Sequence, residues 1–272
     1  MPAARLSVVG TGIRAGGQLT LETRHLIEQA DRVLAVVDGL ALAALQQLNP
    51  NVESLQDCYQ TGSREAGYAE MVRRILAALD QGGEVCAAFY GHPGVFVWPA
   101  HEAIRQARAR GLEARMYPGI SAEDCLFADL EIDPALHGCQ SYEAMDFYLY
   151  PRTIDPTACL ILWQMAALGD VQRNRFKADP IWLKALAEVL MADFPEDHHA
   201  IIYEAAAFPL AEPRREPIAL GRLDQGHYTQ VSTLFIPPLR VPSLCEQRLA
   251  RVGQDSGALM PSASRRFRQA GG

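Results

Sequence analysis

The segment VCAAFYGHPGVF, residues 85–96, joins a run of apolar residues to a loop that contains two glycines. Five successive apolar residues are typical of a strand that is buried on both faces of a sheet. Gly91 and Gly94 have no β-carbon, so the loop backbone can approach a ligand closely. In an open parallel sheet, ligands bind at the carboxyl ends of the strands, where this loop lies. Tyr90 and His92 are therefore candidates for lining a ligand site, although His92 has a simpler interpretation as a turn residue that binds the backbone.

Strand and helix patterns alternate on both sides of this segment. The expected strands are 6–9, 33–37, 85–89 and 113–116, and the expected helices are 20–30, 64–79, 99–110 and 121–130. Apolar residues recur at three-and-four spacing in the 64–79 helix, and Gly82 and Gly83 end it. Strands that alternate with helices predict an α/β fold with a mostly parallel sheet and helices on its faces.

The pattern changes after residue 121. The expected strands 160–163, 200–203 and 232–236 have longer connections, and 180–192 is the one long helix expected there. We therefore expect two α/β domains. These are 1–120 with a mostly parallel sheet, 121–240 with a mixed sheet and more antiparallel pairing, and a polar, flexible tail over 241–272.

Composition narrows the class of protein. The chain has 272 residues, 49% apolar and 21% charged, and a net charge of −7, as expected of a globular protein that does not bind nucleic acid. Its six cysteines form no C-x-x-C pair, which favours small buried hydrophobes over disulfides or a metal site. There is no secretory signal and no apolar run of about 20 residues, so we expect no membrane segment and a cytoplasmic location.

The first strand ends in Gly10-x-Gly12-x-x-Ala15, which formally matches a dinucleotide-binding fingerprint. That fingerprint requires a helix to open inside the motif, so that its N-terminus faces the pyrophosphate. Here Gly16, Gly17 and Gln18 precede the first good N-cap, Thr20. A glycine-lined turn is therefore the better interpretation, and a Rossmann-type oxidoreductase is kept as an alternative.

The segment YPGISA, residues 117–122, follows the next strand and leads into a helix that begins at Ser121. A helix N-terminus suits an anionic or polar ligand group. Two glycine loops at the ends of neighbouring strands predict a cleft more strongly than either loop does alone.

Together with VGTG at 9–12, these loops resemble the tetrapyrrole-methylase superfamily, in which the middle motif is commonly Gly-Asp-Pro. His92 replaces the aspartate here. With that histidine, the segments 118–134 and 140–144, followed by LWQ (162–164), YEA (203–205) and STLFIPP (232–238), closely resemble the borosin α-N-methyltransferases. Those enzymes methylate backbone amides of a ribosomally made peptide. The resemblance covers about residues 5 to 238.

The resemblance implies a cofactor cleft between the two α/β domains. It also implies S-adenosylmethionine as methyl donor, S-adenosylhomocysteine as product, and no metal. The family's catalytic pocket matches Arg64, Tyr68, Tyr90 and Tyr59; without the resemblance, Arg64 and Tyr68 are simply an exposed arginine packed on a tyrosine. The expected cofactor-binding residues are Tyr90, His92, Val95, Phe96, Ser121, Ala122, Tyr142, Trp163, Gln164, Tyr203, Glu204, Ala205, Ser232 and Thr233.

Fused borosin enzymes carry their substrate peptide as a C-terminal extension. The 34 residues after Pro238 (272 minus 238) contain Arg265-Arg266-Phe267-Arg268 and lack an aliphatic run. We therefore expect a separate precursor peptide as the substrate, and a homodimer as in the family. The alternatives are a methyltransferase acting on a tetrapyrrole or another small molecule, and a non-catalytic peptide-binding module.

Overall fold

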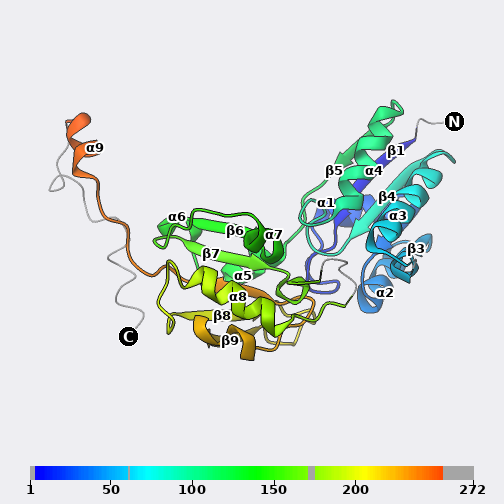
Figure 1. The fold of residues 1–272 in the computed structure, drawn as a ribbon. Coiled ribbons are helices and arrows are strands. Elements are labelled where there is room, and N and C mark those ends of the chain that lie inside the picture. Colours follow the sequence, from blue (N-terminus) through cyan, green and yellow to red (C-terminus); the bar gives the residue numbers. More distant parts are fainter. Residues whose placement is uncertain (1–3, 61, 171–174, 254–272) are drawn as a thin grey trace. The chain divides into compact units, whose positions relative to one another are not determined.

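The computed structural model describes residues 4–60, 62–170 and 175–253, which form two compact units (Figure 1). The first unit contains the described residues up to Leu130, residue 175 and residues 204–214. The second contains residues 131–170, 176–203 and 215–253. The first unit thus extends ten residues beyond the domain boundary expected at 120. It also includes residues 204–214, from the second half of the chain.

The first unit is built on a five-stranded parallel sheet with the order β3-β2-β4-β1-β5. Its strands are β1 (Arg5–Gly10), β2 (Arg32–Val36), β3 (Val52–Ser54), β4 (Glu84–Phe89) and β5 (Glu113–Met116). Its helices are α1 (Leu21–Gln29), α2 (Gly39–Leu48), η1 (Gln56–Gln60), α3 (Arg64–Leu79), α4 (Trp98–Ala109) and α5 (Ala122–Asp129). The parallel sheet expected from the strand–helix alternation is confirmed.

Successive residues of each central strand enter different cores, which explains why these strands are apolar throughout. In β4, Val85, Ala87 and Phe89 pack with α3 and α4, whereas Cys86 and Ala88 pack with α1 and α2. A strand buried on both faces cannot alternate between apolar and polar residues. Thr20 caps α1, and Gly82 and Gly83, both at positive φ, follow α3, as the sequence predicts.

The second unit contains a mixed sheet with the order β6-β7-β10-β8-β9. Its elements are β6 (Cys139–Glu143), β7 (Cys159–Trp163), β8 (His199–Glu204), β9 (Arg214–Ala219), β10 (Thr233–Ile236), α6 (Pro134–His137), α7 (Ala144–Leu149), η2 (Met165–Ala167), α8 (Pro180–Leu190) and η3 (Leu220–Gln225). β10 runs antiparallel to both β7 and β8, and β6 is parallel to β7. The expected antiparallel pairing in this half is therefore confirmed, as is the α/β fold with two domains.

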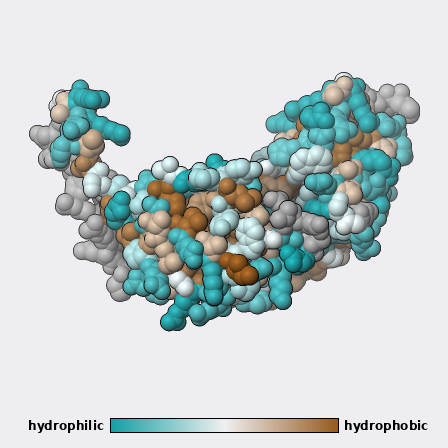
Figure 2. Space-filling view, in the orientation of Figure 1, coloured by the Kyte–Doolittle hydropathy of each residue, from teal (hydrophilic) through white to brown (hydrophobic). Residues whose placement is uncertain are grey.

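The surface differs in character between the two units. Mainly hydrophilic atoms cover α3 and α4 in Figure 2, and larger apolar areas lie on the visible face of the second unit. Leu149, Tyr150 and Ile181, all of the second unit, have side chains that are at least half exposed. Within the described residues, no helix has the length and apolar character needed to span a bilayer.

The expected flexible tail lies mostly outside the described residues. Where the structure describes it, residues 246–251 form a short helix, α9 (Glu246–Arg251), which the sequence analysis did not predict. None of the side chains of α9 is buried, so no hydrophobic core anchors this helix.

Candidate functional site

Three glycines from three neighbouring strands meet at the carboxyl edge of the first sheet. Gly10 ends β1, Gly91 follows β4 and Gly119 follows β5. Gly91 N–H donates to the Gly12 carbonyl over 2.9 Å, and Gly12 N–H donates to the Gly91 carbonyl over 3.3 Å. A β-carbon on Gly10 would lie 2.2 Å from the Gly91 oxygen, and one on Gly119 would lie 2.8 Å from the Gly10 Cα. The loops that the sequence places at one edge therefore touch through their backbones, and no side chain fits between them.

The first loop does not form a dinucleotide-binding turn. Gln18 Oε1 accepts hydrogen bonds from the backbone N–H groups of Ile13 and Arg14 at 2.8 and 2.9 Å, and Ala15 N–H donates to the Ala207 carbonyl. α1 begins only at Leu21, behind this loop. Because no helix opens inside the motif, the structure disfavours the Rossmann alternative.

His92 shapes the loop after β4. Its Nδ1 accepts a hydrogen bond of 2.9 Å from Gly94 N–H, and its carbonyl accepts one of 3.2 Å from Val95 N–H. His92 thus has the turn role that was its simpler interpretation, and its cofactor-binding role stays a prediction. Phe96 follows at a φ of +56°, a left-handed conformation that is unfavourable for a bulky residue. Val95 and Phe96 are 45% and 48% exposed, so the loop presents apolar surface.

Ser121 caps α5 and is already engaged by its own helix. Asp124 N–H donates to Ser121 Oγ, while the N–H and Oγ–H of Ser121 both donate to the Asp124 carboxylate. This reciprocal capping box satisfies donors that the first turn would otherwise leave free. Ser121 is only 8% exposed, and its predicted contact with a cofactor stays untested.

We expect Ser121→Ala to lower the free energy of unfolding by about 1 kcal/mol, because the cap is lost. Urea titration of the purified variant measures this change. Glu123→Gln, in the same turn but outside the capping box, serves as the control and should unfold as the wild type does. Equal stability of the Ser121 variant and the control would show that the capping box contributes nothing.

Arg64, Tyr68 and Tyr59 form one cluster. Arg64 Nε–H donates to the Tyr68 hydroxyl over 2.9 Å, one helical turn away on α3, which confirms that the two side chains share a face. The guanidinium also lies over the Tyr59 ring, 4.7 Å from its centroid. Tyr59 and Tyr68 meet edge to face at 6.4 Å. Burial raises the pKa of Tyr59, and the positive charge of Arg64 opposes that rise.

Trp98 belongs to the same cluster, and the sequence analysis missed it. Its ring stacks on Tyr68 with centroids 6.3 Å apart, and it is 51% exposed. It begins α4, immediately after the loop 90–97. A tryptophan that opens a helix directly after the loop expected to line a ligand is the sequence signal that could have identified it.

Tyr90 lies in a different environment from this cluster. It is 37% exposed, and partial burial, with the nearby Cys125 and Asp38, raises its pKa to about 12. Its neutral phenol is therefore the form favoured in the folded protein.

Tyr90→Phe should remove one late phase from the ultraviolet titration of the tyrosines, because this phenol ionises near pH 12 instead of near its ordinary pKa of 10. A group whose pKa is raised on folding stabilises the fold while neutral. The wild type should thus lose stability as pH rises from 10 towards 12, and the variant should lose less. Disappearance of a phase near pH 10 in the variant would contradict this assignment.

The cofactor-binding residues predicted in the second half of the chain gather at one end of the second sheet. Thr233 pairs with Tyr203 at the start of β10, beside the end of β7 where Trp163 lies. Trp163 Nε1–H donates to Ser141 Oγ over 2.7 Å. Gln164 follows at a φ of +58°, a strained conformation of the kind that occurs at functional sites.

These residues differ in accessibility. Tyr203, Ser232, Thr233 and Trp163 are buried, whereas Gln164 is partly exposed. Partial exposure is shared by Tyr142, Glu204, Ala205 and Ala122. Tyr142 lies under the Arg152 guanidinium at 5.3 Å, and Glu204 accepts a hydrogen bond of 2.8 Å from Arg214. A direct cofactor contact of any of these residues stays a prediction. Among the described residues, no three acidic, histidine or cysteine side chains gather in a way that could hold a metal ion.

Comparison with known proteins places these motifs in context. The family described as tetrapyrrole (corrin/porphyrin) methylases matches residues 5–219. A Dendrothele bispora protein, named as a methyltransferase and precursor of the ribosomally synthesized cyclic peptide dendrothelin A, is 40% identical over 239 residues. The match covers 86% of this chain and 57% of that protein. The corresponding omphalotin A precursor of Omphalotus olearius is 37% identical over 242 residues, with 87% and 58% covered.

Solved structures share the fold. A cobalt precorrin-4 methyltransferase superposes with a TM-score of 0.63 at 18% identity, covering 86% of this chain and 94% of that one. The uroporphyrin-III C-methyltransferase of Thermus thermophilus, complexed with S-adenosyl homocysteine, gives 0.60 at 18% identity, with 86% and 92% covered. The chain spans less than two thirds of the length of the curated relatives named above.

Proposed function

Because the chain belongs to the tetrapyrrole methylase family, as its motifs predicted, we propose that it is an S-adenosylmethionine-dependent methyltransferase that methylates backbone amide nitrogens of a peptide. The observation that carries this proposal is the cluster of Arg64, Tyr68 and Tyr59, in which a permanent positive charge touches two phenol groups. The names of the curated relatives join a methyltransferase to a peptide precursor, which supports a peptide as the substrate.

The chemistry of an amide explains what the site must do. The nitrogen lone pair is delocalised into the carbonyl, so a neutral amide is a poor nucleophile, and its N–H is a very weak acid. Methylation requires that the proton leaves the nitrogen and that negative charge develops on the carbonyl oxygen. The site must therefore supply a base for the proton and a positive donor for the oxygen.

Arg64 supplies the positive donor. A guanidinium has five N–H groups in a fixed fork and keeps its charge at every relevant pH. Its Nε–H donates to the Tyr68 hydroxyl over 2.9 Å, so a substrate carbonyl would be bound through the Nη side of the guanidinium. The rings of Tyr59 and Tyr68 hold the guanidinium by cation–π contact at 4.7 and 5.3 Å, which fixes its direction.

Tyr68 is the base that the geometry favours. Its oxygen accepts a hydrogen bond from Arg64, so a phenolate at this position is stabilised by a permanent positive charge, and it becomes the neutral phenol when it takes the amide proton. Burial raises the pKa of Tyr90 to about 12, so very little of its phenolate is present in the free protein near neutral pH. We assign Tyr90 to contact with the cofactor and the substrate instead.

The loops of the first unit fit S-adenosylmethionine. Tyr90 is a partly exposed aromatic ring close to the carboxylate of Asp38, which suits a group that carries a positive sulfonium. Val95 and Phe96 offer apolar surface beside glycine backbone. When bound, the cofactor supplies an electrophilic methyl group and leaves as S-adenosylhomocysteine. The remaining predicted contacts, in both units, belong to this proposal, as do a homodimer and a peptide that is supplied as a separate molecule.

A methylation assay with the purified chain tests the function. It is incubated with S-adenosylmethionine and a synthetic peptide rich in valine, isoleucine and glycine, and the peptide is analysed by tandem mass spectrometry. We expect mass increases of whole methyl units that map to backbone nitrogens. A peptide of the same side chains with ester bonds in place of the amides is the control and should stay unmodified. Methylation of an added tetrapyrrole, with the amide peptide left unmodified, would overturn the peptide proposal.

A further inference from the structure

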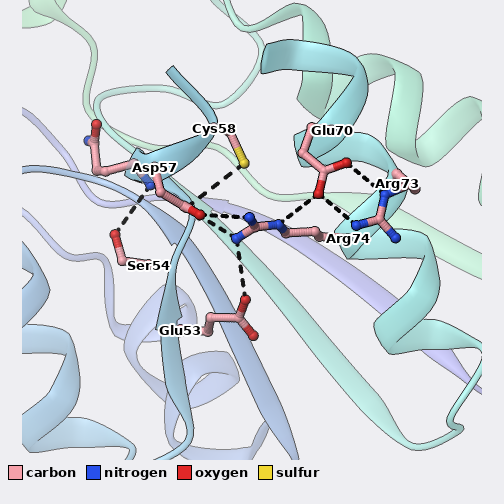
Figure 3. A network of polar contacts seen from close by, with 8 residues as sticks. Glu53, Ser54, Asp57, Cys58, Glu70, Arg73 and Arg74 are labelled. Atoms are coloured by element: carbon pink, nitrogen blue, oxygen red, sulfur yellow. Dashed lines mark hydrogen bonds and ion pairs between the residues drawn. The ribbon is translucent and has the colours of Figure 1, made fainter. Parts of the chain in front are cut away.

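An ion-pair network joins β3, η1 and α3 of the first unit (Figure 3). At its centre, Arg74 of α3 contacts acidic side chains from three elements. It binds the Asp57 carboxylate of η1 through two hydrogen bonds of 3.1 and 2.6 Å and Glu70 of α3 at 3.0 Å. Glu53 of β3 lies 3.7 Å away. Arg74 thus links α3 to both β3 and η1.

The segment that this network holds is the one that carries Tyr59. η1 is a five-residue 3-10 helix, Gln56–Gln60, and so short a helix has little stability of its own. Asp57 stands two residues before Tyr59. Between them, Cys58 is fully buried in the core of the first unit, which fixes the inner side of η1. The outer side is fixed by the paired hydrogen bonds between Asp57 and Arg74.

The pKa values of the acidic residues in the network are consistent with these ion pairs. The Arg74 guanidinium lowers the pKa of the Asp57 carboxyl, and Arg73 with Arg74 lowers the pKa of Glu70 to about 2. Both carboxylates therefore stay ionised over the pH range in which an enzyme is assayed, so these ion pairs keep their charges there. Arg74 itself is 27% exposed in its side chain and is held on two sides, by Glu70 and by Asp57.

From this geometry, and resting on the function proposed above, we propose that Arg74 is a positioning residue: by binding Asp57 it fixes η1 so that the Tyr59 ring lies over the Arg64 guanidinium. Arg64 and Arg74 are on the same helix, ten residues apart. The helix therefore sets the position of Arg64, and the Arg74–Asp57 pair sets the position of Tyr59 relative to it. A small shift of a group that orients a reacting centre has a large kinetic effect, even where the contact itself adds little to stability.

The chain offers a matched control for this proposal. Arg73 directly precedes Arg74 on α3. Its two hydrogen bonds of 2.6 Å go to Glu70, on the same helix, and not to η1. Arg73→Gln removes the same charge from the same helix turn as Arg74→Gln does. We expect Arg74→Gln to lower kcat for peptide methylation by about ten- to a hundredfold. Arg73→Gln should leave kcat unchanged, and Arg74→Lys should recover part of the loss because lysine keeps the charge without the fork.

A double-mutant cycle separates positioning from a general structural effect. In a Tyr59→Phe background the phenyl ring can still pack on Arg64, so Arg74→Gln should still lower kcat. In a Tyr59→Ala background, there is no ring left to position. If Arg74 acts through Tyr59, Arg74→Gln causes no further loss of kcat when alanine replaces Tyr59. An equal fold-loss in the wild-type and the Tyr59→Ala backgrounds would overturn the proposal.

A second readout does not depend on activity. In protein labelled with ¹³C-tyrosine, the Tyr59 ring signals are assigned by their absence from Tyr59→Phe. They should move in Arg74→Gln and stay in place in Arg73→Gln, because only the former releases η1. Unmoved Tyr59 signals in Arg74→Gln would refute positioning even if methylation were observed. Moved signals in a protein that methylates no peptide would instead show that the positioning is right and the proposed function is wrong.

Discussion

Replacing Arg64 by methionine should lower the rate of peptide methylation by about 10²–10³-fold while leaving the affinity for S-adenosylhomocysteine unchanged. Methionine is long and flexible enough to keep much of the packing beneath the Tyr59 ring, but it has no charge and no N–H donor. The loss therefore falls on the oxyanion that develops at the amide carbonyl. The glycine loops at the carboxyl edge of the sheet, to which we assign the cofactor, are left intact. Single-turnover assays measure the rate, and titration calorimetry with S-adenosylhomocysteine measures the affinity.

Two further variants test whether the effect is specific to the charge and geometry of Arg64. Arg64→Lys keeps a positive charge but cannot bond to Tyr68 and to a substrate oxygen through one planar fork, so we expect only partial recovery. Glu65→Gln changes the neighbouring, exposed residue and should behave as the wild type does. If the Arg64 and Tyr68→Phe variants both lose cofactor affinity in step with the rate, the cluster binds the cofactor and the catalytic assignment is refuted.

Much of the fold follows from local patterns in the sequence. β1, β2 and β4 appear where the sequence has apolar runs, because strands buried on both faces have little room for polar residues. β5 also appears where expected, although Glu113 and Arg115 interrupt its apolar character. The helices with clear caps, such as α1 behind Thr20 and α5 behind Ser121, also appear where expected.

Of the elements that were not predicted, β3 and α7 lack such signals, whereas α2 has one in its N-cap Asp38. β3 has three residues, one of them a glutamate, and joins the sheet only because β2 offers it an edge to pair with. α7 begins directly after β6 with Glu143 as its N-cap, so no turn residue marks the change from strand to helix. Pairing partners and tertiary packing decide such short segments, and a single sequence shows neither.

Part of the candidate site could likewise be predicted from the sequence, and part could not. That Arg64 and Tyr68 share a face follows from their spacing of four residues on a helix, and the hydrogen bond between them confirms it. The stacking of Trp98 on Tyr68 joins residues thirty positions apart, and the bond from Arg74 to Asp57 crosses from one element to another. Both depend on how α3 packs against its neighbours, which residue spacing within one helix does not encode.

Gly10→Ala should also have a large effect, on both stability and cofactor affinity, because it places a methyl group where the three glycine loops meet. The added methyl group would lie 2.2 Å from the Gly91 carbonyl oxygen and 2.8 Å from Pro93 Cδ, and neither atom is at the end of a flexible side chain. The loop after β4 must therefore move away from β1, which breaks the paired hydrogen bonds between Gly12 and Gly91. We expect the free energy of unfolding to fall by about 1–3 kcal/mol and the affinity for S-adenosylhomocysteine to be lost.

Gly39→Ala is the matched control, since a β-carbon on Gly39 meets no atom within 4 Å and the residue begins α2. That variant should bind S-adenosylhomocysteine as the wild type does and should unfold at the same or a slightly higher urea concentration. If Gly10→Ala fails to fold, Gly119→Ala applies the same test more gently, because its closest contact is 2.8 Å. Unchanged binding in a folded Gly10 or Gly119 variant would mean that the cofactor does not depend on the contact between these loops. The sulfonium would then have to be held elsewhere on the chain.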